Sequence, residues 1–148
     1  MSKEKQLIVV GVDGSRHSLA ALRWAAGQAE LAGGLVHAVM SWEWSTNPFN
    51  MGAKGRDGEP VTPEEAAREK LATALAETFP GGTVPDAVKG RAVQGDPAHV
   101  LVEESQSASL LVVGTRGYGG FKSAMLGSVS QQVVQYAACT VVVVREES

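Results

Sequence analysis

The sequence predicts a three-layer α/β fold in which helices cover both faces of one open parallel sheet. Along the chain, five short apolar runs alternate with four segments whose apolar residues recur at helical spacing. The first run, Leu7 to Val12, is almost continuously apolar, as expected of a strand that is buried on both faces. Helices that connect successive parallel strands form right-handed crossovers, so this alternation predicts a parallel sheet.

The first part of the chain contains two predicted strands and one helix. Asp13-Gly14-Ser15 follows the strand Leu7 to Val12, and either Asp13 or Ser15 can serve as the N-cap of a helix that runs to about Ala32. Gly33-Gly34 ends this helix, because glycine readily adopts the left-handed conformation that follows many helices. The second strand spans Leu35 to Met40.

The alternation continues after an irregular stretch from Ser41 to Pro60. Thr62-Pro63 begins the second helix with a capping hydroxyl and a proline at the first helical position. Its predicted core face comprises Ala67, Leu71, Ala74 (or Leu75) and Thr78. The later elements are a strand within Ala87 to Val93, a helix from Asp96-Pro97 to about Ser107 and a strand from Leu110 to Val113. A helix that begins at Ser128 and a strand from Thr140 to Arg145 follow. On this last helix, Val129, Val133, Tyr136 and Ala137 lie on one side.

A glycine-rich segment lies between the strand Leu110 to Val113 and the helix that begins at Ser128. Glycine has no Cβ, so a ligand can approach the backbone amides of such a loop closely. The first amides of the following helix, together with the positive end of its dipole, form an anion site, and Arg116 adds positive charge. The segment therefore predicts a phosphate-binding loop, although it contains neither a Walker motif nor G-x-G-x-x-G.

The spacing Gly114, two residues, Gly117, nine residues, Gly127-Ser128 resembles the ATP-binding signature of the universal stress protein family. The resemblance extends over nearly the whole chain, through VGVDGSRHSLAALRWA, VHAV, QGDP and the last valine-rich strand. It implies one domain over residues 1–148 and a Rossmann-like sheet of the adenine-nucleotide-binding type, with strand order 3-2-1-4-5. In that order, the ends of strands one and four are neighbours.

The resemblance also implies a set of nucleotide-binding residues. Gly114, Gly117, Gly127 and Ser128 would hold the phosphates and ribose, with Val129 and Ser130 as further backbone and hydroxyl donors. Ala38 and Val93, at or near the ends of strands two and three, would lie against the adenine. For these last two residues, ordinary packing within the sheet is the alternative interpretation.

Asp13 raises a question of charge, because a carboxylate repels a triphosphate. A Mg²⁺ ion between the two would reverse the sign, since Mg²⁺ commonly binds one or two carboxylates together with substrate phosphates. The alternative is that Asp13 only caps the first helix. We expect Asp13, Gly14 and Ser15 to border the nucleotide, with Asp13 as the metal ligand and Ser15 as a helix cap that also contacts phosphate.

Other reactive side chains give no comparable pattern. His17, His37 and His99 lack metal-ligand spacing, and sequence order alone supports no Ser-His-Asp set. Cys139 has no partner for a disulfide within the chain, and we interpret it as a small buried apolar residue. Catalytic residues are therefore not assigned.

Composition and charge predict a cytoplasmic protein. The net charge of −3 gives no reason to expect nucleic acid or a membrane surface as a partner. No apolar run approaches the about 18 residues of a membrane span, and the N-terminus lacks the apolar region of a signal peptide.

The last strand predicts self-association. In the implied strand order, Thr140 to Val144 lies at the edge of the sheet, where unpaired backbone groups beside apolar side chains invite pairing. We expect this strand to pair with its own copy in a twofold homodimer, as members of the family do. Cover by the N-terminal tail or the long loop is the alternative.

Three functions from different classes follow from these observations. The first is an ATP-binding, homodimeric regulator of stress or dormancy responses whose state depends on nucleotide occupancy, with at most weak ATPase activity. The second is a slow ATP hydrolase, or another nucleotide-using enzyme of the same fold group, with a catalytic group supplied by the stretch Trp42 to Pro60. The third is a structural dimer without ligand, and the glycine motif argues against it.

Overall fold

The computed structural model describes residues 6–44, 60–115 and 127–146. The elements in chain order are β1 (Leu7–Gly11), α1 (Arg16–Ala32), β2 (Leu35–Trp42), α2 (Pro63–Thr78), the 3₁₀ turn η2 (Pro80–Gly82), β3 (Val88–Gln94), α3 (Pro97–Ser105), β4 (Leu110–Gly114), α4 (Ser128–Tyr136) and β5 (Thr140–Val144). All neighbouring strands pair in parallel, in the order β3-β2-β1-β4-β5. The predicted α/β class and strand order are confirmed.

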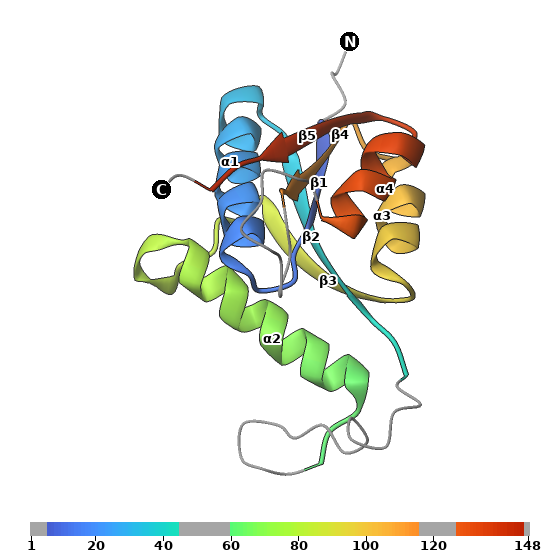
Figure 1. The fold of residues 1–148 in the computed structure, drawn as a ribbon. Helices are drawn as coiled ribbons and strands as arrows, with labels where there is room; N and C mark the ends of the chain where they lie inside the picture. Colours follow the sequence, from blue (N-terminus) through green and yellow to red (C-terminus); the bar gives the residue numbers. More distant parts are fainter. Residues whose placement is uncertain (1–5, 45–59, 116–126, 147–148) are drawn as a thin grey trace.

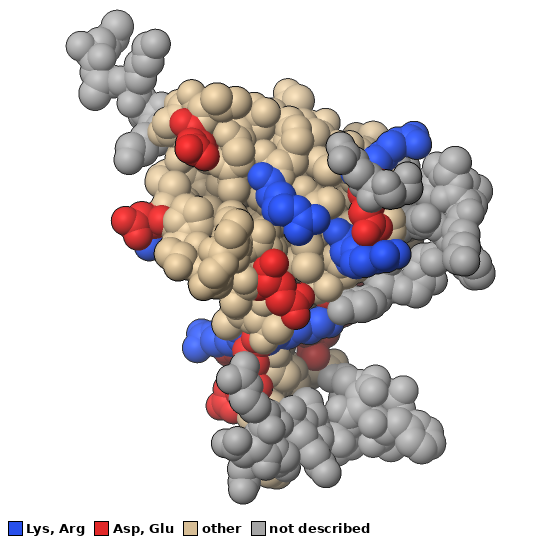
Figure 2. All heavy atoms as spheres, turned by 90° about the vertical axis from the view of Figure 1, so that its left-hand side faces the viewer, with Lys and Arg blue, Asp and Glu red and all other residues tan. Residues whose placement is uncertain are grey.

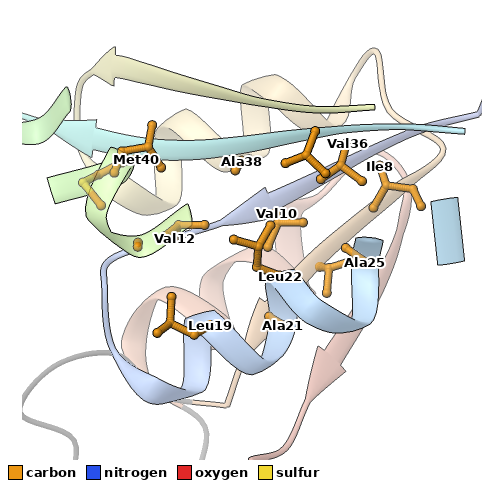
Figure 3. Close-up of a cluster of buried hydrophobic side chains, with 14 of the residues drawn as sticks. Ile8, Val10, Val12, Leu19, Ala21, Leu22, Ala25, Val36, Ala38 and Met40 are labelled. Atoms are coloured by element: carbon orange, nitrogen blue, oxygen red, sulfur yellow. The ribbon is translucent and has the colours of Figure 1, made fainter. Parts of the chain in front are cut away.

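The helices form one layer on each face of the sheet, with α1 and α2 on one side and α3 and α4 on the other (Figure 1). Alternate residues of a strand point to opposite faces, so Val10 packs with Leu22 of α1 while Val9 packs with Leu101 of α3. Figure 3 shows the first of these two cores, where the side chains of β1 and β2 meet the inner side of α1. Both faces of β1 are therefore buried, as its continuous apolar run predicts.

Local capping residues begin the first three α-helices at the expected places. The hydroxyl of Ser15 accepts a hydrogen bond from the Ser18 amide at 3.2 Å, which identifies Ser15 rather than Asp13 as the N-cap of α1. Thr62 and Asp96 cap α2 and α3 in the same way. Gly33 ends α1 in the left-handed conformation, with φ of 71°.

The sequence-based placements of the β2 end and of Tyr136 differ from the structure. Strand β2 extends beyond Met40 to Trp42, because Ser41 and Trp42 still pair with Val93 and Gln94 of β3. On α4, the buried side is centred on Ser130 and Val133, so Tyr136 lies on its flank and is 63% exposed. Tyr136 was predicted on the same side of the helix as Val133, but a helix turns by about 100° per residue, so three residues from Val133 bring it only to the rim of that side.

Cys139 is only partly buried, and this burial raises the pKa of its thiol.

On the face shown in Figure 2, Lys and Arg side chains are interspersed with Asp and Glu, so no extended patch of one sign forms there. Within the described ranges, no helix combines the length and apolar character that a membrane span requires.

Candidate nucleotide-binding site

The candidate site lies where the carboxyl ends of β1 and β4 adjoin. These two strands pair directly, with Val10 opposite Val112, although α1, β2, α2, β3 and α3 separate them in sequence. The winding of the sheet reverses between them, and ligands of open parallel α/β sheets bind outside the carboxyl ends of strands at such a point. Two junctions meet here: the turn from β1 into α1, and the connection from β4 to α4.

The β1–α1 junction is closed by its own hydrogen bonds. One carboxylate oxygen of Asp13 accepts the Ser15 amide at 2.8 Å, and the Asp13 amide donates to the Ser18 hydroxyl at 3.2 Å. That hydroxyl in turn donates to the Ser15 carbonyl at 2.9 Å, and Gly14 makes the turn with a φ of 87°. Asp13 is therefore a structural part of the turn, whatever else it binds.

Gly114, at the end of β4, is contacted closely by the first turn of α1. A Cβ at this position would lie 2.6 Å from the carbonyl oxygen of His17, and the residue is buried. The structure thus gives Gly114 a packing role that does not depend on a ligand: it lets the start of α1 approach the end of β4.

The β4–α4 junction is held by backbone and hydroxyl contacts to two carbonyls. The Gly127 amide donates to the Thr115 carbonyl at 2.7 Å. The buried hydroxyl of Ser130 donates to the Gly114 carbonyl at 2.6 Å, and its oxygen lies 3.3 Å from the carbonyl oxygen of Thr115. Ser130 was expected to donate a hydrogen bond to the nucleotide. In this structure its hydroxyl instead donates to the protein backbone and so fixes α4 against β4.

The amino end of α4 differs from those of the other described α-helices. Its N-cap is Gly127, which has no side chain to accept a hydrogen bond from the first turn. Backbone bonding within the helix begins with Gln131, whose amide donates to the Gly127 carbonyl at 2.9 Å. The amides of Ser128, Val129 and Ser130 thus have no acceptor within the helix, and no cap side chain accepts the third of them, as happens in α1, α2 and α3. The Ser128 side chain is exposed and Val129 is half-buried. Such amides, at the positive end of a helix dipole, suit an anionic ligand.

The two residues expected near the adenine lie in different surroundings. Ala38 pairs with Val10 and Gly90 in the middle of β2 and is completely buried in the core shown in Figure 3. Its predicted position near the end of the strand was wrong, because β2 runs four residues further. Val93 lies opposite Ser41, near the carboxyl end of β3, and is only partly buried.

Arg116 and Gly117, the remaining predicted site residues, lie outside the described residues. Among the residues that the structure describes, no three His, Cys, Asp or Glu side chains are grouped as a metal site would require. A Mg²⁺ ion at Asp13 would therefore take further ligands from phosphate oxygens or water, which is how proteins commonly hold Mg²⁺.

Sequence reasoning missed one cluster at this edge of the sheet. The Nδ1 atom of His17 lies 3.3 Å from the Thr115 hydroxyl, and its Nε2 atom lies 3.9 Å from a carboxylate oxygen of Glu146. The other oxygen of Glu146 pairs with Nε of Arg16 at 3.3 Å. No spacing rule could have found this cluster, because its members come from the start of α1, the end of β4 and the segment after β5.

The strand order, the two-sided helix layers and the junctions at the switch point define an open parallel α/β protein of the Rossmann-like type. The sequence profile of the universal stress protein family matches residues 6–145. The chain belongs to this family.

Two curated relatives show the extent of the similarity. A universal stress protein of Mycolicibacterium smegmatis is 36% identical over 143 residues, which cover 93% of this chain and 47% of the relative. One from Thermus aquaticus is 34% identical and is covered to 97% of its own length. The chain spans about half the length of the first relatives that it matches.

Solved structures of the family superpose on the chain. A universal stress protein in complex with cAMP has a TM-score of 0.68 at 26% identity, with 98% of this chain and 100% of that chain covered. The Archaeoglobus fulgidus universal stress protein in complex with dAMP has a TM-score of 0.62, covering 95% and 97% of the two chains. At 21% identity, this second likeness shows the shared fold alone.

Proposed function

We propose that this protein binds ATP at the junction of β1, β4 and α4, and that nucleotide occupancy sets the state of a homodimeric regulator of stress or dormancy responses. The observation that supports this most is the first turn of α4, where Ser128 and Val129 present amides without an acceptor in the helix and Gly127 offers no capping side chain. The similar universal stress protein in complex with cAMP supports an adenine nucleotide as the ligand.

The phosphates would lie against the amides of Ser128 and Val129, with Gly127 allowing close approach. Arg116 and Gly117, between β4 and α4 in the sequence, would complete this part of the site. Asp13 would hold Mg²⁺ together with phosphate oxygens, while its other role is to accept the Ser15 amide. The adenine would extend toward Val93, beside the carboxyl ends of β2 and β3.

The proposal assigns binding rather than fast catalysis. Among the described residues near the junction, His17 has both ring nitrogens directed at Thr115 and Glu146, so neither is directed at a water molecule that it could activate. A slow ATP hydrolase is the second candidate, and the two differ in how long bound ATP survives.

Calorimetric titration with ATP, ADP, AMP and cAMP, each with Mg²⁺ and with EDTA, tests the ligand. We expect saturable ATP binding and an ATP-dependent rise in melting temperature, because a ligand that binds only the folded state stabilises it. Chromatography of nucleotide released by heating then shows whether ATP persists for hours, as in a regulator, or has turned over. A protein that neither binds ATP nor melts at a higher temperature in its presence would contradict the proposal.

The homodimer is proposed to form through the exposed edge of β5. Its four valines lie at the edge of the sheet and are half-buried. On the neighbouring helix α4, Val134 is 50% exposed and Tyr136 is 63% exposed. The Val144 carbonyl accepts the Thr115 amide and so faces β4, which leaves the backbone groups of Val143 directed outward. Val143→Pro removes a backbone N–H that points away from the sheet, toward the proposed partner. Val142→Pro is the control, because it removes a backbone N–H that points toward β4. Sedimentation should show a monomer for a folded Val143→Pro and loss of folding for Val142→Pro.

A further inference from the structure

The cluster around His17 joins three segments that are far apart in sequence. His17 lies in the first turn of α1, Thr115 directly follows β4, and Glu146 lies just beyond β5. The side chains of His17 and Glu146 are 21% and 24% exposed, whereas that of Arg16 is 84% exposed. The contact between His17 and Glu146 is thus the sheltered part of the cluster, and Arg16 is its solvent-exposed rim.

The surroundings of the ring assign a role to each of its nitrogens. The Glu146 carboxylate faces Nε2 and favours a proton on that nitrogen. In that tautomer Nδ1 carries a lone pair, so it accepts a hydrogen bond from the Thr115 hydroxyl, 3.3 Å away. Glu146 therefore orients the ring, and the ring holds the side chain of Thr115.

Thr115 is also the residue to which the amino end of α4 is attached. Its carbonyl accepts the Gly127 amide at 2.7 Å, and its own amide donates to the Val144 carbonyl at 3.2 Å. The close approach of α1 at Gly114 brings His17 within reach of this residue. A continuous path of contacts thus runs from Glu146 through His17 and Thr115 to Gly127, where the first turn of α4 begins.

We propose that His17 is a positioning residue of the nucleotide site. By holding the Thr115 side chain, it fixes the carbonyl that anchors Gly127, and so sets where the amides of Ser128 and Val129 point. His17 does not itself contact the nucleotide in this proposal, which rests on the function proposed above. A misplaced anion site binds weakly because hydrogen bonds to a charged group depend strongly on distance and angle.

Asparagine and glutamine at position 17 separate the two contacts of the ring. The amide of Asn can reach the position of Nδ1, and that of Gln the position of Nε2. In titrations with ATP, we expect His17→Asn to retain Kd within about twofold and His17→Gln to raise it roughly tenfold, the effect of one hydrogen bond. Thr115→Val should match His17→Gln, and the double variant should be no weaker than either single one. Arg16→Gln, at the exposed rim, is the matched control and should leave Kd unchanged.

Hydrogen exchange of the Gly127 amide gives a second measurement that needs no nucleotide. His17→Gln and Thr115→Val should speed exchange of this amide, while His17→Asn and Arg16→Gln should not, and core amides of β1 should stay protected in every variant that folds. If the wild type binds no ATP but this exchange pattern holds, the proposed function fails and the positioning role stands.

Three results would overturn the role of His17. The first is an unchanged Kd for ATP together with unchanged exchange of the Gly127 amide in His17→Gln. The second is an equal loss of ATP affinity in His17→Asn and His17→Gln. The third is a loss of ATP affinity in the double variant that equals the sum of the two single losses. Because Thr115→Val breaks the same contact from the opposite side, failure of one histidine variant to fold leaves the test intact.

Discussion

The two junctions at the centre of the sheet use their hydrogen-bonding groups differently. At the β1–α1 junction, Asp13, Ser15 and Ser18 bond to one another and to the local backbone, so the turn completes itself. At the β4–α4 junction, Gly127 caps the helix without a side chain, so the Ser130 amide lacks the kind of acceptor that Ser15 provides for Ser18 in α1.

This difference supports the proposal that the ligand binds at the β4–α4 junction. A side-chain cap stabilises a helix without any ligand, and substituting a capping residue typically costs about 1 kcal/mol. An uncapped helix forgoes that stability, which an anion can restore on binding. The β1–α1 junction is thus a structural support, and the β4–α4 junction is the proposed binding element. The predictions below test this division of roles.

The largest effect should come from giving α4 the cap that it lacks. Gly127 has φ of −69° and ψ of 167°, a conformation open to any residue, so Gly127→Asp can place a carboxylate on the first-turn amides. We expect ATP affinity to fall at least about a hundredfold, or about 2.7 kcal/mol, while thermal stability is unchanged or rises. Gly127→Ala, which adds neither cap nor charge, measures the effect of the added Cβ alone, and its loss of affinity should be smaller than that of Gly127→Asp. ATP binding equal to wild type in Gly127→Asp would place the phosphates elsewhere.

The next largest effect concerns the contact between the junctions. Gly114→Ala would set a Cβ 2.6 Å from the His17 carbonyl and should destabilise the protein by about 1–3 kcal/mol in urea unfolding. Gly27→Ala on α1, where nothing lies within 4 Å of the added atom, should instead stabilise it by about 0.5–1 kcal/mol. Equal responses of the two variants would show that the approach of α1 to β4 does not constrain Gly114.

Ser130 and Ser128 provide a test within one helix. Ser130→Ala leaves a buried carbonyl contact unmade and should cost about 1–2 kcal/mol in stability, with weaker ATP binding because α4 shifts. Ser128→Ala, at an exposed side chain, should change stability by under about 0.5 kcal/mol. A stable Ser130→Ala protein with normal ATP affinity would contradict the positioning of α4 by this hydroxyl.

A smaller loss of stability than at Gly114 or Ser130 is expected at Asp13. Asparagine keeps the oxygen that accepts the Ser15 amide, so Asp13→Asn should retain stability within about 0.5 kcal/mol, whereas Asp13→Ala should lose about 1 kcal/mol. If Asp13 also holds Mg²⁺, Asp13→Asn should weaken ATP binding in Mg²⁺ and tighten it in EDTA, because a carboxylate without its metal repels the triphosphate. Identical titrations of wild type and Asp13→Asn in both buffers would restrict Asp13 to the turn.

Most of the fold followed from local signals in the sequence. Continuous apolar runs indicate strands buried on both faces, and Thr62-Pro63, Asp96-Pro97 and Gly33 mark helix ends, because these signals depend on a few neighbouring residues. The strand order came from family resemblance, since hydrophobic periodicity contains no information about which strands pair.

The site was less predictable, because it depends on contacts across the chain. The interpretation of Ser130 as a ligand donor could not anticipate that the Gly114 carbonyl takes its hydrogen bond. Ala38 was misplaced because the length of β2 depends on its pairing with β3, and His17 was set aside because its partners lie in distant segments. The predicted roles of Gly127, Ser128 and Val129 stay predictions that the titrations above can test.

The bond from the Thr115 amide to the Val144 carbonyl ties the last residue of the exposed strand to the residue that anchors α4. A second protein copy that straightens or shifts this strand therefore displaces the same carbonyl on which α4 depends. Thermodynamic linkage then requires reciprocity: if dimerisation tightens ATP binding by some factor, ATP must tighten dimerisation correspondingly. The fraction of the protein that is dimeric would in that case depend on the ATP concentration, without any chemical step.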